Sequence, residues 1–185
     1  MGNAPILIIS GTNRPHANAL RVARIVERNY AAIDEPCELF SLQDLPREMF
    51  DPASYAHKPP GIVALQQRIL AARGLHIVTP EYNGSFPGVL KYFIDMLKFP
   101  ESFEHKPVAF VGEASGMWGG LRPVEQLQQI FSYRNAHILP QRVFIPGVRT
   151  KFDDSGKFTD VAIDEMLAKQ CEKFAVFAAR VSAHS

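Results

Sequence analysis

The sequence predicts an α/β protein built on one doubly wound, five-stranded parallel sheet with helices on both faces. Two observations support this prediction. Short apolar runs alternate along the chain with longer segments in which apolar residues recur at helical spacing. Polar turns, several with glycine, follow the apolar runs, as is typical where a buried parallel strand gives way to a helix. The length of 185 residues suits one domain, and we expect residues 1–185 to form it.

Five segments have the pattern of strands. Residues 5–10 (PILIIS) form a continuous apolar run that ends at Gly11, which indicates a strand buried on both faces. The remaining predicted strands cover residues 38–41, 75–79, 108–111 and 138–145, and the last of these is broken by Pro140.

Five segments have helical spacing of their apolar residues. Asn18 is a plausible N-cap for the first of them, and Pro87 lies near the start of the third, where its missing N–H is harmless. The predicted helices cover residues 18–30, 62–72, 87–99, 124–131 and 160–183. Residues 43–60 are irregular and hold four prolines, and a long loop of this kind is more often functional than idle.

Composition excludes several classes of protein. The formal net charge of +1 gives no overall attraction to nucleic acid or to an anionic membrane. The longest apolar runs fall short of the roughly 20 residues of a membrane helix, and the N-terminus lacks a basic segment and cleavage site typical of a secretory signal. Cys37 and Cys171 have no CxxC spacing, so free thiols and a cytoplasmic location are expected. The six histidines lack paired ligand spacing, so no metal site is predicted, and no GxSxG elbow is present.

The turn after the first strand, Ser10 to Asn18, has the features of a phosphate site. Gly11 permits a tight turn, and the helix that follows offers unpaired N–H groups and a positive dipole end. Thr12 and Asn18 can form hydrogen bonds, and Arg14 can pair with a phosphate monoester. The fixed glycine patterns of dinucleotide and Walker loops are absent. An ordinary N-capped turn has the same residue types, so this alternative stays open.

The turn after the third strand, Pro80 to Gly88, is the most informative segment. Prolines stiffen both ends, and Gly84 lets the backbone approach a flat ligand. Tyr82 can stack on a ring or on a partner chain. Glu81 is assigned no acid–base role, because a lone carboxylate in a turn is more often a cap or a surface charge.

The turn after the fourth strand, Glu113 to Gly120, holds three glycines and the only tryptophan of the chain. The glycines leave little core for Trp118 to fill, so a place at the rim of a site competes with the usual burial of tryptophan. All three turns leave the carboxyl edge of the sheet, where α/β proteins bind ligands.

These segments resemble the NADPH-dependent FMN reductase family of flavodoxin-like proteins, which includes quinone, chromate and azo-dye reductases. The most specific match is P-E-Y-N-G-S-x-P-G-x-L-K at residues 80–91, followed by Ile94-Asp95. The glycine-rich segment 114–120 and the turn 152–160 also match, so the resemblance covers nearly the whole chain.

The resemblance implies strand order 2-1-3-4-5 and an FMN cofactor reduced by NADPH or NADH. The hydride would then pass through FMN to a small-molecule electron acceptor by ping-pong exchange, with no catalytic side chain. FMN phosphate would bind at residues 12–20 and the ring between residues 80–84 and 115–119. The implied cofactor-binding residues are Thr12, Arg14, Asn18, Ala19, Leu20, Pro80, Glu81, Tyr82, Asn83, Gly84, Ser115, Gly116, Trp118 and Gly119.

The resemblance also implies a homodimer or homotetramer with the flavin near a subunit interface. Four phenylalanines are candidates for apolar interface surface, although a core role is expected for Phe93: these are Phe86, Phe93, Phe99 and Phe103. Residues 49–55, or a partner subunit, are expected to form the rim of the pocket. Neither a nucleic acid nor a membrane partner is implied.

The first turn departs from the family pattern G-S-x-R-x-x-S-x-N. Ala17 and Ala19 stand where the later Ser and Asn are expected, which predicts weaker FMN binding. This departure leaves open a domain that has lost its flavin. A separate alternative is a flavodoxin-like electron carrier, although such carriers are usually strongly acidic and this chain is nearly neutral.

Overall fold

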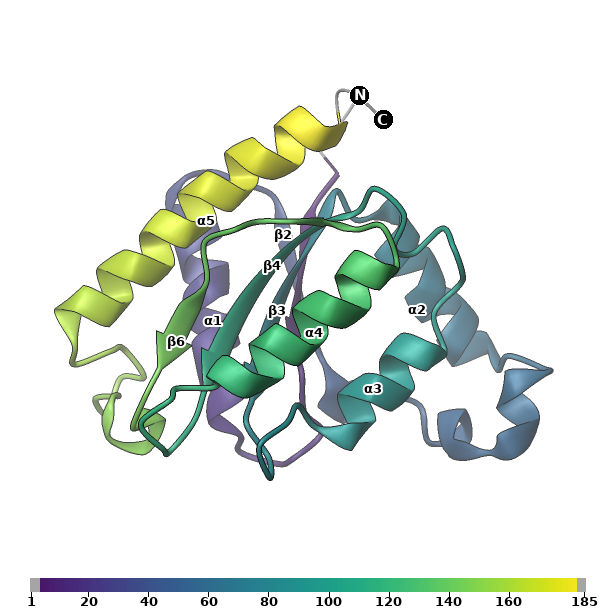
Figure 1. Cartoon of the computed structure of the whole chain (residues 1–185), viewed down its shortest axis with the longest axis horizontal. Coiled ribbons are helices and arrows are strands. Elements are labelled where there is room, and N and C mark those ends of the chain that lie inside the picture. Colours follow the sequence, from purple (N-terminus) through teal and green to yellow (C-terminus); the bar gives the residue numbers. More distant parts are fainter. Residues whose placement is uncertain (1–3, 183–185) are drawn as a thin grey trace.

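The computed structural model describes residues 4–182 and shows a six-stranded sheet covered by helices on both faces (Figure 1). All paired strands are parallel, and their order is β2-β1-β3-β4-β5, with β6 also paired to β4. The predicted fold class and strand order are confirmed. The predicted fifth strand is two short strands, β5 (His137–Ile138) and β6 (Val143–Ile145). Pro140 lies between them and has no N–H to give to the sheet.

The other four strands are where their apolar runs predict them. Every residue of the three central strands is buried, which explains why these runs are mostly apolar and do not alternate with polar residues. β2 lies at the edge and is partly exposed. The bounds are β1 (Ile6–Ser10), β2 (Cys37–Ser41), β3 (Gly74–Pro80) and β4 (Pro107–Glu113).

Two apolar cores lie on the two faces of the sheet. Ile6 and Ile8 of β1 belong to the core under α1 (Asn18–Ala32) and α5 (Val161–Ser182). The intervening β1 residues, Leu7 and Ile9, belong to the core on the opposite face. That core is covered by α2 (Pro60–Ala71), α3 (Gly88–Asp95) and α4 (Leu121–Tyr133). The alternation follows from the two-residue period of a strand.

Two predictions on this second face need correction. The apolar spacing predicts a third helix that reaches residue 99, but α3 ends at Asp95, and residues before Pro100 turn instead. Phe103 is a candidate for interface surface by sequence, but it is buried with its ring against Phe131 at 5.6 Å. Phe93 is buried, as its predicted core role requires.

The irregular segment after β2 forms three short 3₁₀ helices: η1 (Leu42–Asp44), η2 (Arg47–Phe50) and η3 (Pro52–Tyr55). The segment packs on α3, where the Tyr92 hydroxyl donates to the Met49 carbonyl at 2.9 Å. The Tyr92 ring also lies 5.2 Å from Phe50 and 6.0 Å from Tyr55.

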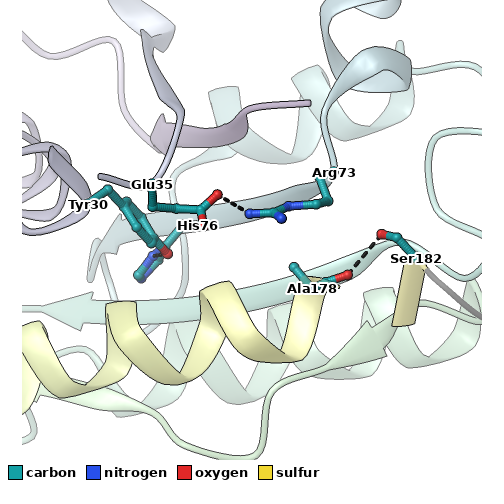
Figure 2. A network of polar contacts seen from close by, with 6 residues as sticks. All are labelled: Tyr30, Glu35, Arg73, His76, Ala178 and Ser182. Atoms are coloured by element: carbon teal, nitrogen blue, oxygen red, sulfur yellow. Dashed lines mark hydrogen bonds and ion pairs between the residues drawn. The ribbon is translucent and has the colours of Figure 1, made fainter. Parts of the chain in front are cut away.

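A buried polar cluster joins α1, β3 and α5. The His76 ring accepts from the Tyr30 hydroxyl at Nδ1 (2.8 Å) and donates from Nε2 to Gln170 Oε1 (3.2 Å). Burial lowers the pKa of His76 to about 4, so the ring is neutral and structural. Figure 2 shows Tyr30 and His76 beside the ion pair of Glu35 and Arg73.

Candidate functional site

The carboxyl ends of β1, β3 and β4 meet at one edge of the sheet, and the turns that follow them enclose two adjoining hollows. The register places Ser10 of β1 beside Val78, and Pro80 beside Glu113. The first hollow, called here the basic hollow, has about 430 Å³ and is lined by residues 14–18, 80–82 and 113–115 together with Arg149. The second, called the tryptophan hollow, has about 220 Å³ and is lined by residues 81, 83–84, 114–116, 118 and 122.

The turn after β1 brings the start of α1 to the basic hollow. Gly11 is needed because a Cβ there would lie 2.9 Å from the Val78 carbonyl oxygen. The N-cap residue of α1 is Ala17, whose side chain caps nothing, so the first N–H groups of the helix have no side-chain partner at this position. Thr12 is fully buried, and its hydroxyl lies 3.1 Å from the Tyr82 hydroxyl, which ties the first turn to the second.

The turn after β3 is held by backbone bonds between Tyr82 and Ser85 at 2.8 and 3.1 Å. Asn83 and Gly84 at its tip both have positive φ. Glu81 carries an ion pair to Arg122 at 2.9 Å, and the Arg122 guanidinium lies 5.8 Å from the centre of the Trp118 ring.

The turn after β4 is packed tightly at one end and open at the other. Gly119 and Gly120 have positive φ and press on the backbone of Ile145 and Glu113. At the open end, a Cβ added to Gly116 would meet nothing within 4 Å. Trp118 is 51% exposed and lines the tryptophan hollow, so it is not buried in the core.

The basic hollow is lined by side chains of both charge types. Arg14, His16 and Arg149 contribute basic side chains, and Glu81 and Glu113 contribute carboxyls. Glu113 is 5% exposed, and the nearby Ala19 backbone N–H favours the charged form of its carboxyl. Burial is the larger effect and raises the pKa of Glu113 to about 7.

Most of the predicted site residues are brought together here. Arg14, Asn18, Pro80, Tyr82, Asn83, Gly84, Gly116 and Trp118 each line one hollow, and Glu81 and Ser115 line both. Thr12, Ala19 and Gly119 lie buried behind these surfaces. Leu20 is the outlier, because it lines a separate hollow with Arg24 and Asp44. Residues 49–55 line neither hollow.

Three residues in or beside the hollows are missed by sequence reasoning. Glu113 is the last residue of a buried strand at the carboxyl edge, and that position is a usable signal. Arg122 follows the Gly119–Gly120 pair by two residues, and this position is an equally usable signal in the sequence. Arg149 comes from η4 (Val148–Thr150), whose approach to the first turn is set by the tertiary fold.

Comparison with known proteins settles the family. The family model for NADPH-dependent FMN reductase matches residues 4–149. The chain belongs to this family. A quinone reductase of Escherichia coli is 34% identical over 164 residues, which is 86% of this chain and 87% of the relative. An NAD(P)H-dependent FMN reductase of Pseudomonas aeruginosa is 32% identical over 126 residues, or 66% of this chain and 68% of the relative.

Solved structures share the fold. The structure of FerB, a flavoenzyme NAD(P)H:(acceptor) oxidoreductase from Paracoccus denitrificans, superimposes with a TM-score of 0.80. It covers 96% of this chain and 98% of its own at 20% identity, and this likeness is one of fold. Within residues 4–182 no helix is both long and apolar enough to cross a membrane. The same residues contain no group of three or more His, Cys, Asp or Glu side chains arranged to hold a metal ion.

The two hollows fit the FMN of this family in all but one respect. The basic hollow provides arginines and the first turn of a helix, which suit a phosphate. The tryptophan hollow provides turn backbone and an exposed aromatic side chain, which suit a flat ring. The exception is Glu113, a carboxyl at the anion-binding end of α1.

Proposed function

We propose that this member of the family is an FMN-dependent NAD(P)H oxidoreductase that reduces a small acceptor by ping-pong exchange. The acceptor classes that fit the family are quinones, azo compounds, metal oxyanions and free flavin. The observation that carries the proposal is that turns from three strands enclose adjoining hollows, one basic and one flanked by an exposed tryptophan. The whole chain would act as one FMN-binding domain.

When bound, FMN supplies the hydride and electron chemistry, and the chain's own residues bind and orient it. Arg14 and Arg149 would pair with the phosphate at the start of α1. Backbone groups of residues 80–84 and 115–119 would hold the ring. Thr12 supports this surface from behind through its contact with Tyr82. Leu20 is left out of the proposed set, since its side chain faces another hollow.

Glu81 would act through position and not as an acid or base. Its carboxylate is engaged by Arg122, which also lies over the Trp118 ring. This chain of contacts fixes the wall of the tryptophan hollow where a nicotinamide or acceptor would stack. No side chain here needs to be a nucleophile, because the cofactor carries the hydride.

The test is a pair of half-reactions on protein loaded with FMN. Anaerobic addition of NADPH or NADH should bleach the visible flavin absorbance, and a quinone should then restore it. A flavin that resists both nicotinamides would point to an electron carrier instead. Protein that takes up no FMN would point to a domain without flavin. A panel of acceptors assayed with each nicotinamide would then name the preferred pair.

We also propose that the chain forms a homodimer or homotetramer. A groove of about 380 Å³ between α3 and α4 is bordered by Phe99 and Tyr133, which are 61% and 79% exposed. Lys91, Asp95, Gln129 and Arg134 also line this groove, and exposed aromatic side chains with a polar rim are typical of protein interfaces. Light scattering should give two or four times the chain mass of 20.7 kDa, and a monomer would contradict the proposal.

A further inference from the structure

Glu113 lies beside the start of α1 and belongs to another element of the fold, β4. The helix begins at Asn18, and Ala17 at the N-cap position has no side-chain oxygen. The Glu113 carboxyl, at the end of β4, instead lies near the backbone N–H of Ala19, which favours its charged form, and lines the same hollow as the start of the helix. An N-cap oxygen normally accepts from this second or third N–H of a helix. A carboxyl of the chain therefore lies close to the position at which a helix N-terminus binds an external anion.

The surroundings of Glu113 leave its charge largely uncompensated. The groups that line the same hollow are Arg14 and His16 from the first turn, Glu81 and Tyr82 after β3, and Arg149 from η4. Glu81 already pairs with Arg122 of α4. Among residues 4–182, no ion pair joins Glu113 to any of the cations. With the side chain almost wholly buried, a second anion in contact with it would be strongly disfavoured.

We propose that Glu113 controls the phosphate end of the flavin site, so that FMN binds with Glu113 protonated and takes up a proton from solvent when it binds. The inference rests on the proposed function. The proton moves from water to a Glu113 carboxylate oxygen, which then becomes a donor rather than a competing acceptor. The Ala19 N–H is released to the phosphate. Riboflavin has the same ring and no phosphate, so its binding does not require a protonated Glu113.

The direction of the pH dependence follows from linkage. Below the pKa of Glu113, about 7, the carboxyl is already protonated and FMN binds without penalty. Above that pKa, FMN affinity should fall by up to about tenfold for each pH unit. The flavin phosphate has its own ionisation near pH 6 by analogy with phosphorylated side chains. Measurements between about pH 7 and pH 8.5 therefore isolate the contribution of Glu113.

The experiment compares FMN and riboflavin dissociation constants at about pH 7 and pH 8.5, measured by flavin fluorescence on the full chain. For the wild type, the FMN constant should rise by roughly an order of magnitude, while the riboflavin constant stays level. Glu113→Gln keeps the shape and the acceptor oxygen without the charge. Its FMN dissociation constant should therefore be the same at both pH values, and at the higher pH it should be lower than that of the wild type. Glu81→Gln removes the other carboxyl of the hollow, so it changes the FMN constant itself but should keep the wild-type ratio between the two pH values.

A second readout needs no variant. Calorimetric titration of the wild type with FMN at about pH 8.5, in buffers of different ionisation enthalpy, should show uptake of close to one proton for each FMN bound. A pH-independent FMN constant with no proton uptake would overturn the role of Glu113 and leave the proposed function intact. Failure of both wild type and Glu113→Gln to bind FMN at either pH would overturn the proposed function itself.

Discussion

At the scale of single residues, two carboxylates of the same hollow have opposite environments. Glu81 forms an ion pair with Arg122, although one of its oxygens is buried without a hydrogen-bond partner in the chain. Glu113 lies near the Ala19 backbone N–H and has no ion-pair partner among residues 4–182. The difference arises from position. Glu81 begins an exposed turn that faces α4, whereas Glu113 ends a central strand with its carboxyl beneath the start of α1.

The free energy of unfolding of the apoprotein should fall at high pH, because the buried Glu113 carboxyl becomes charged. The folded pKa of about 7 lies above the ordinary value of 4.5. The stability that the protonated carboxyl provides is therefore complete below pH 4.5 and is lost as the pH rises through 7. Glu113→Gln should be more stable than the wild type by about 1–3 kcal/mol at about pH 8.5 and by less at about pH 6.

Urea unfolding of both proteins at the two pH values measures this difference. Glu81→Gln is the matched control, since its carboxylate has a cation partner and no comparable gain is expected. Equal wild-type and Glu113→Gln stabilities at both pH values would mean that the buried carboxyl carries no cost when it ionises.

At the scale of elements, the connection between β4 and α4 positions the third turn. Gly112, Gly119 and Gly120 meet so closely that a Cβ on Gly120 would lie 2.5 Å from the Glu113 backbone nitrogen. Gly120 also has a φ of 85°, in the left-handed region. This contact holds the turn against the strand end, so that residues 114–118 project over the hollows.

Gly120→Ala should therefore destabilise the fold by at least about 2 kcal/mol, through both the left-handed backbone and the clash. In a thermal melt this corresponds to a fall of about 4–8 °C in Tm. Gly116→Ala in the same turn is the control, because a Cβ there meets open space, and its Tm should stay close to the wild-type value. A Gly120→Ala protein with wild-type Tm would contradict this view of the turn.

At the scale of the whole molecule, the fold could be predicted because its signals are local. Continuous apolar runs such as residues 5–10 are typical of a strand that is buried on both faces, and the alternation with helices then favours parallel pairing. The third helix is overestimated because residues 96–99 keep helical spacing of apolar side chains while the backbone turns. Residues 43–60 have no periodic signal, and their 3₁₀ helices depend on packing against Tyr92.

The candidate site could be predicted in part, for a related reason. Strand ends mark which turns share an edge, so Arg14, Tyr82 and Trp118 can be found from the sequence. The contact between Glu113 and Ala19 joins residues far apart in the chain and depends on the angle at which α1 leaves β1. Arg149 likewise reaches the hollow through the path of the chain after β6. Neither contact has a local sequence pattern.

A crystal structure of the protein grown with FMN tests the central claim most directly. The account predicts FMN phosphate at the first turn of α1 between Arg14 and Arg149, with the ring between residues 80–84 and 115–119. FMN bound elsewhere, for example in the groove between α3 and α4, or no FMN at the carboxyl edge of the sheet under saturating conditions, would contradict it.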